Sequence, residues 1–112
     1  MDAERERRAK NEAIFREVNE RIDELSRRSG VEGEDSILPG FVCECSDEGC
    51  TELLEVTYKH YQAVRENPRR FRVVPGHEDP EVDLVVDRSD GSLIVEKRIE
   101  ASRIALDHDP RE

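Results

Sequence analysis

The sequence is poor in the large apolar side chains from which a small domain builds its core. It contains no tryptophan, three phenylalanines and two tyrosines among 112 residues. Hydrophobic residues make up 35% of the chain, whereas charged residues make up 41%. A domain with so little core material commonly needs a bound metal, a disulfide or a partner subunit to fold stably.

Long apolar runs are also missing. Residues 1–30 lack the apolar segment of a signal peptide, and no run approaches the roughly 20 residues that cross a bilayer. We therefore expect a cytoplasmic protein with no membrane partner. Thiols stay reduced in the cytoplasm, so clustered cysteines there bind metal or carry out redox chemistry more often than they form disulfides.

Basic residues are scarce in the middle of the chain, and the formal net charge is -10. Residues 31–60 contain eight acids and one base, Lys59. Binding to phosphate backbones depends on clustered lysine and arginine, so nucleic acid is not expected to bind this region. The main local basic cluster surrounds Phe71 and consists of Arg65, Arg69, Arg70 and Arg72. We expect these arginines to form ion pairs with nearby carboxylates.

All three cysteines lie in one stretch, FVCECSDEGC, at residues 41–50. Cys43 and Cys45 point the same way on an extended strand, and a turn over residues 46–49 returns Cys50 to them. We expect Gly49 to have a positive φ in this turn and to aim N–H groups at the sulfurs. Zinc takes four sulfur or nitrogen ligands in a tetrahedron, so the spacing predicts structural zinc.

Two other interpretations of the cysteines remain open, namely three buried core residues and a catalytic or redox thiol. Glu44, Asp47 and Glu48 argue against the reactive thiol, because neighbouring carboxylates raise a thiol's pKa and suppress the thiolate. The sequence contains no nucleophile elbow, zinc-protease helix or phosphate-binding glycine loop. We therefore predict that the protein is not an enzyme.

The fourth zinc ligand is predicted to be His77. This residue follows a short strand and the Pro75-Gly76 turn, so a strand that returns beside residues 41–45 would deliver it to the cysteines. His60 lies in a predicted helix and His108 in a predicted tail, where ordering the chain costs entropy. Both histidines, and a carboxylate, remain alternatives.

Residues 3–28 predict one long helix, because they contain no proline or glycine and are rich in Ala, Glu, Arg and Lys. Its apolar residues form one narrow stripe, hereafter the apolar stripe: Ile14, Val18, Ile22 and Leu25. So narrow a face must pack on the rest of the chain, on a protein partner or on a second copy of itself. Acid–base pairs four residues apart are expected to add stability: Glu12–Arg16, Glu17–Arg21 and Glu24–Arg28.

The fold class predicted is α+β, with a long N-terminal helix followed by a small β-rich zinc-binding module that contains one short helix. Strands are predicted at residues 41–45, 51–56, 71–74, 82–87 and 93–96, and the short helix at 58–66, with Thr57 as its N-cap. The expected divisions are a charged helix at 1–30, an acidic linker at 31–40, the metal-binding module at 41–97 and a flexible tail at 98–112.

Several stretches between residues 11 and 97 resemble a group of small actinobacterial proteins for which no activity is established. They are NEAIFREVNERI, FVCECSDEGC, the pattern Tyr61-x-x-Val64-Arg65-x-x-Pro68-x-Arg70-Phe71, and Val74-Pro75-Gly76-His77-Glu78. The resemblance implies one recurring metal set: Cys43, Cys45, Cys50 and His77. It implies neither a substrate nor a partner.

The function that we expect is a non-enzymatic interaction or regulatory module stabilised by zinc, with a protein partner or a homodimer formed through the apolar stripe. One alternative is a zinc- or redox-responsive sensor that unfolds when it loses its metal. Another is a nucleic-acid-associated regulator that uses the arginines around Phe71.

Overall fold

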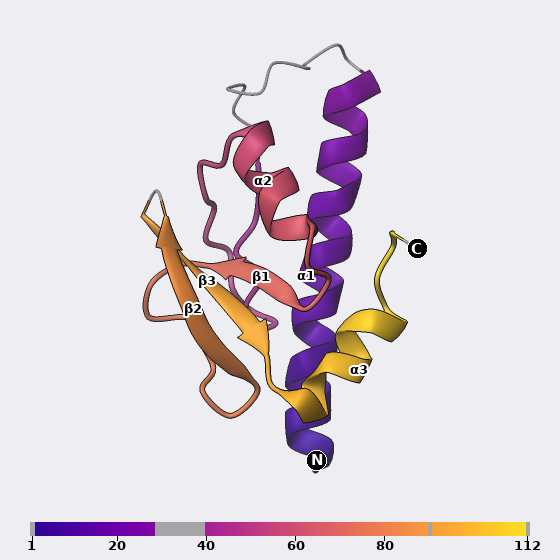
Figure 1. The fold of residues 1–112 in the computed structure, drawn as a ribbon, viewed down its shortest axis with the longest axis vertical. Helices are drawn as coiled ribbons and strands as arrows, with labels where there is room; N and C mark the ends of the chain where they lie inside the picture. Colours follow the sequence, from indigo (N-terminus) through magenta and orange to yellow (C-terminus); the bar gives the residue numbers. More distant parts are fainter. Residues whose placement is uncertain (1, 29–39, 90, 112) are drawn as a thin grey trace.

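The computed structural model describes residues 2–28, 40–89 and 91–111. Most of the predicted acidic linker, 31–40, lies outside these ranges. The fold is α+β, as predicted, and a third helix follows the sheet (Figure 1). The elements in chain order are α1 (Ala3–Arg28), α2 (Tyr58–Arg65), β1 (Arg70–Val73), β2 (Asp83–Ser89), β3 (Ser92–Lys97) and α3 (Ile99–Asp107).

The described strands form one antiparallel sheet in the order β1-β3-β2. The predicted hairpin is confirmed, since β2 pairs with β3 in the register Ser89↔Ser92 next to the turn. Phe71 and Val73 of β1 lie opposite Val95 and Leu93 of β3, and all four are buried. Their side chains pack in one cluster with Cys43 and Cys45, so the cysteines are part of the main core.

The predicted strands at 41–45 and 51–56 are wrong as regular elements. Only an isolated antiparallel bridge forms there, between Val42 and Leu53. Two backbone bonds flank it, from Cys43 N–H to the Glu52 carbonyl at 3.1 Å and from Leu54 N–H to the Phe41 carbonyl at 2.9 Å. The chain bends after Cys43 and Cys45 to bring Cys50 back, and this bend stops the ladder from continuing.

The predicted short helix is confirmed as α2, with the Thr57 hydroxyl accepting a hydrogen bond from His60 N–H at 3.2 Å. The flexible tail expected at 98–112 needs correction, because residues 99–107 form α3. Ala101 and Ala105 lie one turn apart and are buried. Their small side chains let α3 approach α1, where Ala101 packs in a cluster with Ala9.

The orientation of α1 is the largest departure from the sequence prediction. The apolar stripe does not face the rest of the chain, since Ile14, Val18 and Leu25 are 55%, 42% and 53% exposed. The face that α1 buries is mainly polar, and it consists of Ala9, Glu12, Ala13, Arg16, Asn19, Asp23 and Ser26. In Figure 1 the sheet and α2 lie on one side of α1, and α3 crosses its lower half.

Long-range ion pairs explain how α1 can bury charged groups. Lys97 of β3, which is fully buried, donates to Glu12 of α1 and, at 2.6 Å, to Asp83 of β2. The Lys97 ammonium also lies 4.0 Å from the centre of the Phe71 ring, and the Arg16 guanidinium lies 3.9 Å from the same point.

Three acid–base pairs within α1 were predicted, and only one of them forms. Glu24 and Arg28 are joined at 2.8 Å. Glu12 pairs with Lys97 instead of Arg16, and Glu17 forms no ion pair with Arg21 in the described part of the chain. The helix therefore turns several of its charges inward rather than toward each other.

The surroundings of Glu12 favour the protonated form of its carboxyl group. Burial is the main cause that raises the pKa of Glu12 well above its ordinary value; Lys97 opposes this shift and Asp83 adds to it. Within the described residues, one carboxylate oxygen of Glu12 and one of Asp83 are buried without a hydrogen-bond partner. A proton on Glu12 that points to Asp83 satisfies both atoms and leaves Lys97 and Asp83 as a balanced pair.

The raised pKa of Glu12 makes the stability of the fold depend on pH. Because the folded state holds the Glu12 proton more tightly than the unfolded chain, the free energy of unfolding should fall as pH rises above 4.5, toward the pKa of folded Glu12. The substitution Glu12→Gln keeps a neutral donor at this place, so urea denaturation over a pH series should show a flatter profile than the wild type.

The control is Glu6→Gln, because Glu6 is exposed and pairs with Lys10 at 3.2 Å within the helix; it should keep the wild-type pH profile. Removing the cation instead, by Lys97→Met, leaves Asp83 buried without its partner and should cost about 3–5 kcal/mol. An unchanged pH profile for Glu12→Gln would contradict the assignment of the proton.

Candidate metal centre

The structure brings the four predicted ligands together. One donor atom from each of Cys43, Cys45, Cys50 and His77 lies within 4.8 Å of all the others. The Nδ1 atom of His77 is 3.7 Å from the sulfur of Cys43 and 3.5 Å from that of Cys50. Zinc bonds of ordinary length at a tetrahedral angle separate sulfur from nitrogen by about 3.6 Å, so the donor set fits this ion.

Two short segments place these ligands. Residues 41–45 lie beside β1, because Glu44 N–H donates to the Arg72 carbonyl at 2.9 Å. The chain then leaves β1 through a turn in which His77 N–H donates to the Val74 carbonyl at 2.9 Å, and Gly76 has a φ of 94°. This turn returns His77 to the cysteines, as the sequence predicts.

The cysteine turn is closed by Asp47. Cys50 N–H donates to the Asp47 carbonyl at 3.0 Å, and Gly49 N–H donates to the Asp47 carboxylate at 2.9 Å. The positive φ expected of Gly49 is wrong, since the described glycines with positive φ are at positions 40, 76 and 91. The N–H group aimed at a sulfur comes instead from Val74, which lies 3.2 Å from Cys43 Sγ.

The three thiols hold their protons unequally. A hydrogen bond from Cys43 lowers the pKa of Cys45 to about 5. The same bond, together with burial, raises the pKa of Cys43, and burial raises that of Cys50. A bound dication deprotonates its cysteine ligands outright. Cys45 is therefore the thiol that loses its proton most readily and binds a metal ion at the lowest pH.

Glu44, between two of the cysteines, joins the centre to α1. Successive side chains of an extended segment point in opposite directions, so Glu44 faces away from the metal ligands. Its carboxylate is buried, and it accepts from Arg16 Nε at 2.9 Å and from Asn19 Nδ2 at 3.0 Å. It also accepts from the backbone N–H of Arg72 at 3.0 Å.

Asn19 also binds the backbone of the cysteine segment directly. Its side-chain oxygen accepts from Val42 N–H at 2.8 Å, and its amide nitrogen donates to the Val42 carbonyl at 2.9 Å. The Asn19 amide thus takes the place of a neighbouring strand for this residue. Sequence analysis missed both Glu44 and Asn19, although a buried acid between two metal ligands follows from the alternation of side chains in residues 41–45.

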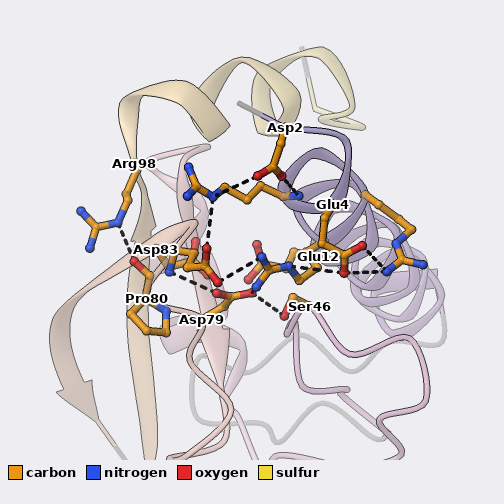
Figure 2. Close-up of polar contacts among 12 residues, drawn as sticks. Asp2, Glu4, Glu12, Ser46, Asp79, Pro80, Asp83 and Arg98 are labelled. Atoms are coloured by element: carbon orange, nitrogen blue, oxygen red, sulfur yellow. Dashed lines mark hydrogen bonds and ion pairs between the residues drawn. The ribbon is translucent and has the colours of Figure 1, made fainter.

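A second link runs through Asp79, which is buried in the loop after His77. In Figure 2 a dashed line joins the side chains of Asp79 and Ser46. The Asp79 carboxylate accepts from the Ser46 hydroxyl at 3.0 Å and from Arg8 Nη1 at 2.8 Å. The loops on both sides of the metal ligands are therefore tied to the same helix.

The other candidate ligands lie elsewhere. His60 is on α2, where its carbonyl accepts from Arg72 Nη2 at 3.4 Å, and His108 is an exposed residue at the end of α3. Neither belongs to the four-residue cluster found among the described residues.

Arg65, Arg69 and Arg70 of the basic cluster form the expected ion pairs. Arg65 is buried and pairs with Glu20, at 3.1 Å, and with Asp109. Arg69 and Arg70 pair with Glu96 at 3.7 Å and 3.0 Å. Arg72 is buried and donates to the Ser92 hydroxyl at 2.8 Å. These contacts hold α1, α2, β1 and β3 together.

Comparison of the sequence with protein-family models, and with curated proteins and solved structures, gives no match. The resemblance to small actinobacterial proteins therefore stays an expectation. Among residues 2–28, 40–89 and 91–111, no helix combines the length and the apolar character that crossing a bilayer requires.

The geometry distinguishes the two histidines experimentally. His77→Ala removes a donor from the cluster, so zinc affinity should fall by about one to two orders of magnitude or more in a competitive chelator titration. His60→Ala is the matched control and should change the affinity little. The reverse ranking of the two variants would contradict the assignment of His77.

Proposed function

We propose that the chain is a non-enzymatic interaction module that is held together by structural zinc and presents α1 to a protein partner. The observation that carries the proposal is the complete set of four protein donors around one point. A zinc ion with four protein ligands has no open position for water or substrate, which is typical of structural rather than catalytic sites. A metal ion is needed because the hydrophobic core is too small to stabilise the fold alone.

The exposed apolar stripe of α1 supports an interaction surface. Its residues share one face of the helix, and the opposite, polar face is used to hold α1 on the sheet. Large apolar side chains gathered on one exposed face are typical of sites where proteins bind each other. The net charge of -10 favours neither nucleic acid nor an anionic membrane as the partner. A reduced cytoplasm, where zinc thiolates persist, is the compartment that we propose.

Nucleic-acid binding by the arginines around Phe71 receives no support from their contacts. Arg65 and Arg72 are buried, and Arg69 and Arg70 are paired with Glu96. A basic surface that recruits phosphates needs exposed cations that are not already neutralised.

Metal content tests the proposal. Purified protein should contain one zinc per chain by elemental analysis, and a strong chelator should lower its melting temperature sharply or abolish cooperative melting. The reason is that structural zinc in small modules contributes roughly 10–16 kcal/mol of apparent binding free energy, which is comparable to the stability of a whole domain.

Cys50→Ser should reproduce the effect of the chelator, whereas Thr51→Ala, at the next and exposed position, should leave zinc content and melting unchanged. Metal-free protein with the wild-type melting curve would overturn the proposal.

A zinc-responsive sensor is a second candidate function, favoured by the contacts of Glu44. This carboxylate follows Cys43, precedes Cys45 and binds Arg16 and Asn19 of α1. A movement of Cys43 or Cys45 on losing the metal would therefore also move Glu44, the neighbouring residue that binds α1. Coupling between two events is reciprocal, so a weaker hold on α1 should also weaken the binding of zinc.

Arg16→Met tests this coupling. It leaves Glu44 buried without its cation and should destabilise the protein by about 3–5 kcal/mol. If zinc binding and α1 docking are coupled, the same variant should also bind zinc at least about tenfold more weakly in a chelator titration, although Arg16 is not a ligand. Arg7→Met, which changes an exposed pair with Glu4, is the control. Unchanged zinc affinity in Arg16→Met would contradict the sensor.

A further inference from the structure

Two charges on α1 differ from all the others. Every other charged side chain of α1 forms an ion pair, either within the helix or across to the sheet, the loops or the C-terminal segment. The side chains of Glu17 and Arg21 form no hydrogen bond or ion pair among the described residues. They are exposed and lie one turn apart, and hence on the same side of the helix.

These two charges border the apolar stripe. A shallow groove of about 360 Å³ runs along this part of α1, and its lining is Ile14, Glu17, Val18, Arg21 and Ile22. The groove therefore combines three apolar side chains with one unpaired acid and one unpaired base. A surface with this composition has the opposite charges that are needed to bind a copy of itself.

We propose that the apolar stripe binds the apolar stripe of a second copy of the chain, with the two α1 helices antiparallel. In this homodimer Glu17 of each chain pairs with Arg21 of the other. The inference rests on the proposed function, because it names the partner of the surface proposed there. It follows from charge complementarity, since both unpaired charges gain partners at once.

The geometry of a two-fold axis shows why the pairing is antiparallel. An axis that runs between the helices, at right angles to both and level with Asn19, places residue 17 of one chain level with residue 21 of the other. The same axis brings the charged edge of one stripe beside the charged edge of its partner. Each chain thus contributes one acid and one base to a closed, symmetric interface.

The same axis also fits the apolar side chains together. It places the partner's Val18 and Ile22 at the levels of residues 20 and 16, between the levels of the first chain's own stripe residues. A parallel pair would instead set Glu17 and Arg21 against the other edge of the stripe, where Asn11 and Phe15 lie, and neither charge would gain a partner. The charges therefore select the antiparallel arrangement.

The contact is small. The stripe spans residues 14–25, which corresponds to about 16 Å of helix, so the buried area lies at the low end for specific protein interfaces. We expect a reversible dimer that forms at high protein concentration and dissociates on dilution.

Charge reversal tests the pairing on the 112-residue, zinc-loaded chain by sedimentation equilibrium. Glu17→Arg places arginine opposite arginine at both ends of the interface, and Arg21→Glu places acid opposite acid. Each variant should self-associate at least about tenfold more weakly than the wild type, because like charges facing each other oppose association. An equimolar mixture of the two variants restores both opposite-charge pairs and should form a heterodimer.

The control is Arg103→Glu on α3, where the side chain of Arg103 is 88% exposed. It makes the same change in charge as Arg21→Glu, but away from the apolar stripe. It should dimerise like the wild type. A wild type that stays monomeric at every concentration overturns the inference. This holds even if its apolar stripe binds an unrelated apolar helix. Single variants that dimerise normally also overturn the inference, and so does a mixture that remains monomeric.

Zinc content measured on the same samples separates this inference from the proposed function. A monomeric wild type with one zinc per chain overturns the dimer alone. A dimer with the expected charge dependence but without zinc supports the dimer and overturns the structural metal.

Discussion

The carboxylate of Glu44 is the contact on which the rest of the structure depends. It is buried between Cys43 and Cys45 in the chain, and it binds Arg16 and Asn19 of α1 as well as the backbone of β1. A buried carboxylate is costly unless charged and polar partners surround it. The cysteine segment, the helix and the sheet must therefore come together at this point, and the candidate metal ligands Cys43 and Cys45 lie on either side of Glu44.

The same constraint accounts for the unusual orientation of α1. A helix that buried its apolar stripe would leave Glu44 and Lys97 in the core without the partners that α1 now supplies. The polar contacts also specify one register, because each buried ion on α1 meets a particular partner on another segment. The apolar stripe is then left on the surface, where it is available to another molecule.

Much of the fold and of the site could be predicted from the sequence. The bounds of α1, the cap of α2, the β2–β3 hairpin and the four clustered ligands follow from local signals such as periodicity, turn residues and cysteine spacing. The buried face of α1 could not be predicted in this way. Hydrophobic periodicity assigns apolar residues to the core, whereas Glu12 and Arg16 are buried because Lys97 and Glu44, far along the chain, bind them there. α3 was underestimated because Ala101 and Ala105 give a weak apolar signal, yet their small size is what permits close packing.

Amide hydrogen exchange of the zinc-loaded chain, with and without a chelator, tests the link between the metal centre and α1 most directly. We predict that the amides of α1 around residues 12–23 are protected in the metal-bound protein and lose most of this protection when zinc is removed, since the backbone that carries Glu44 is then no longer fixed. Protection of these amides that is unchanged after complete removal of zinc would contradict the dependence of the helix on the metal centre.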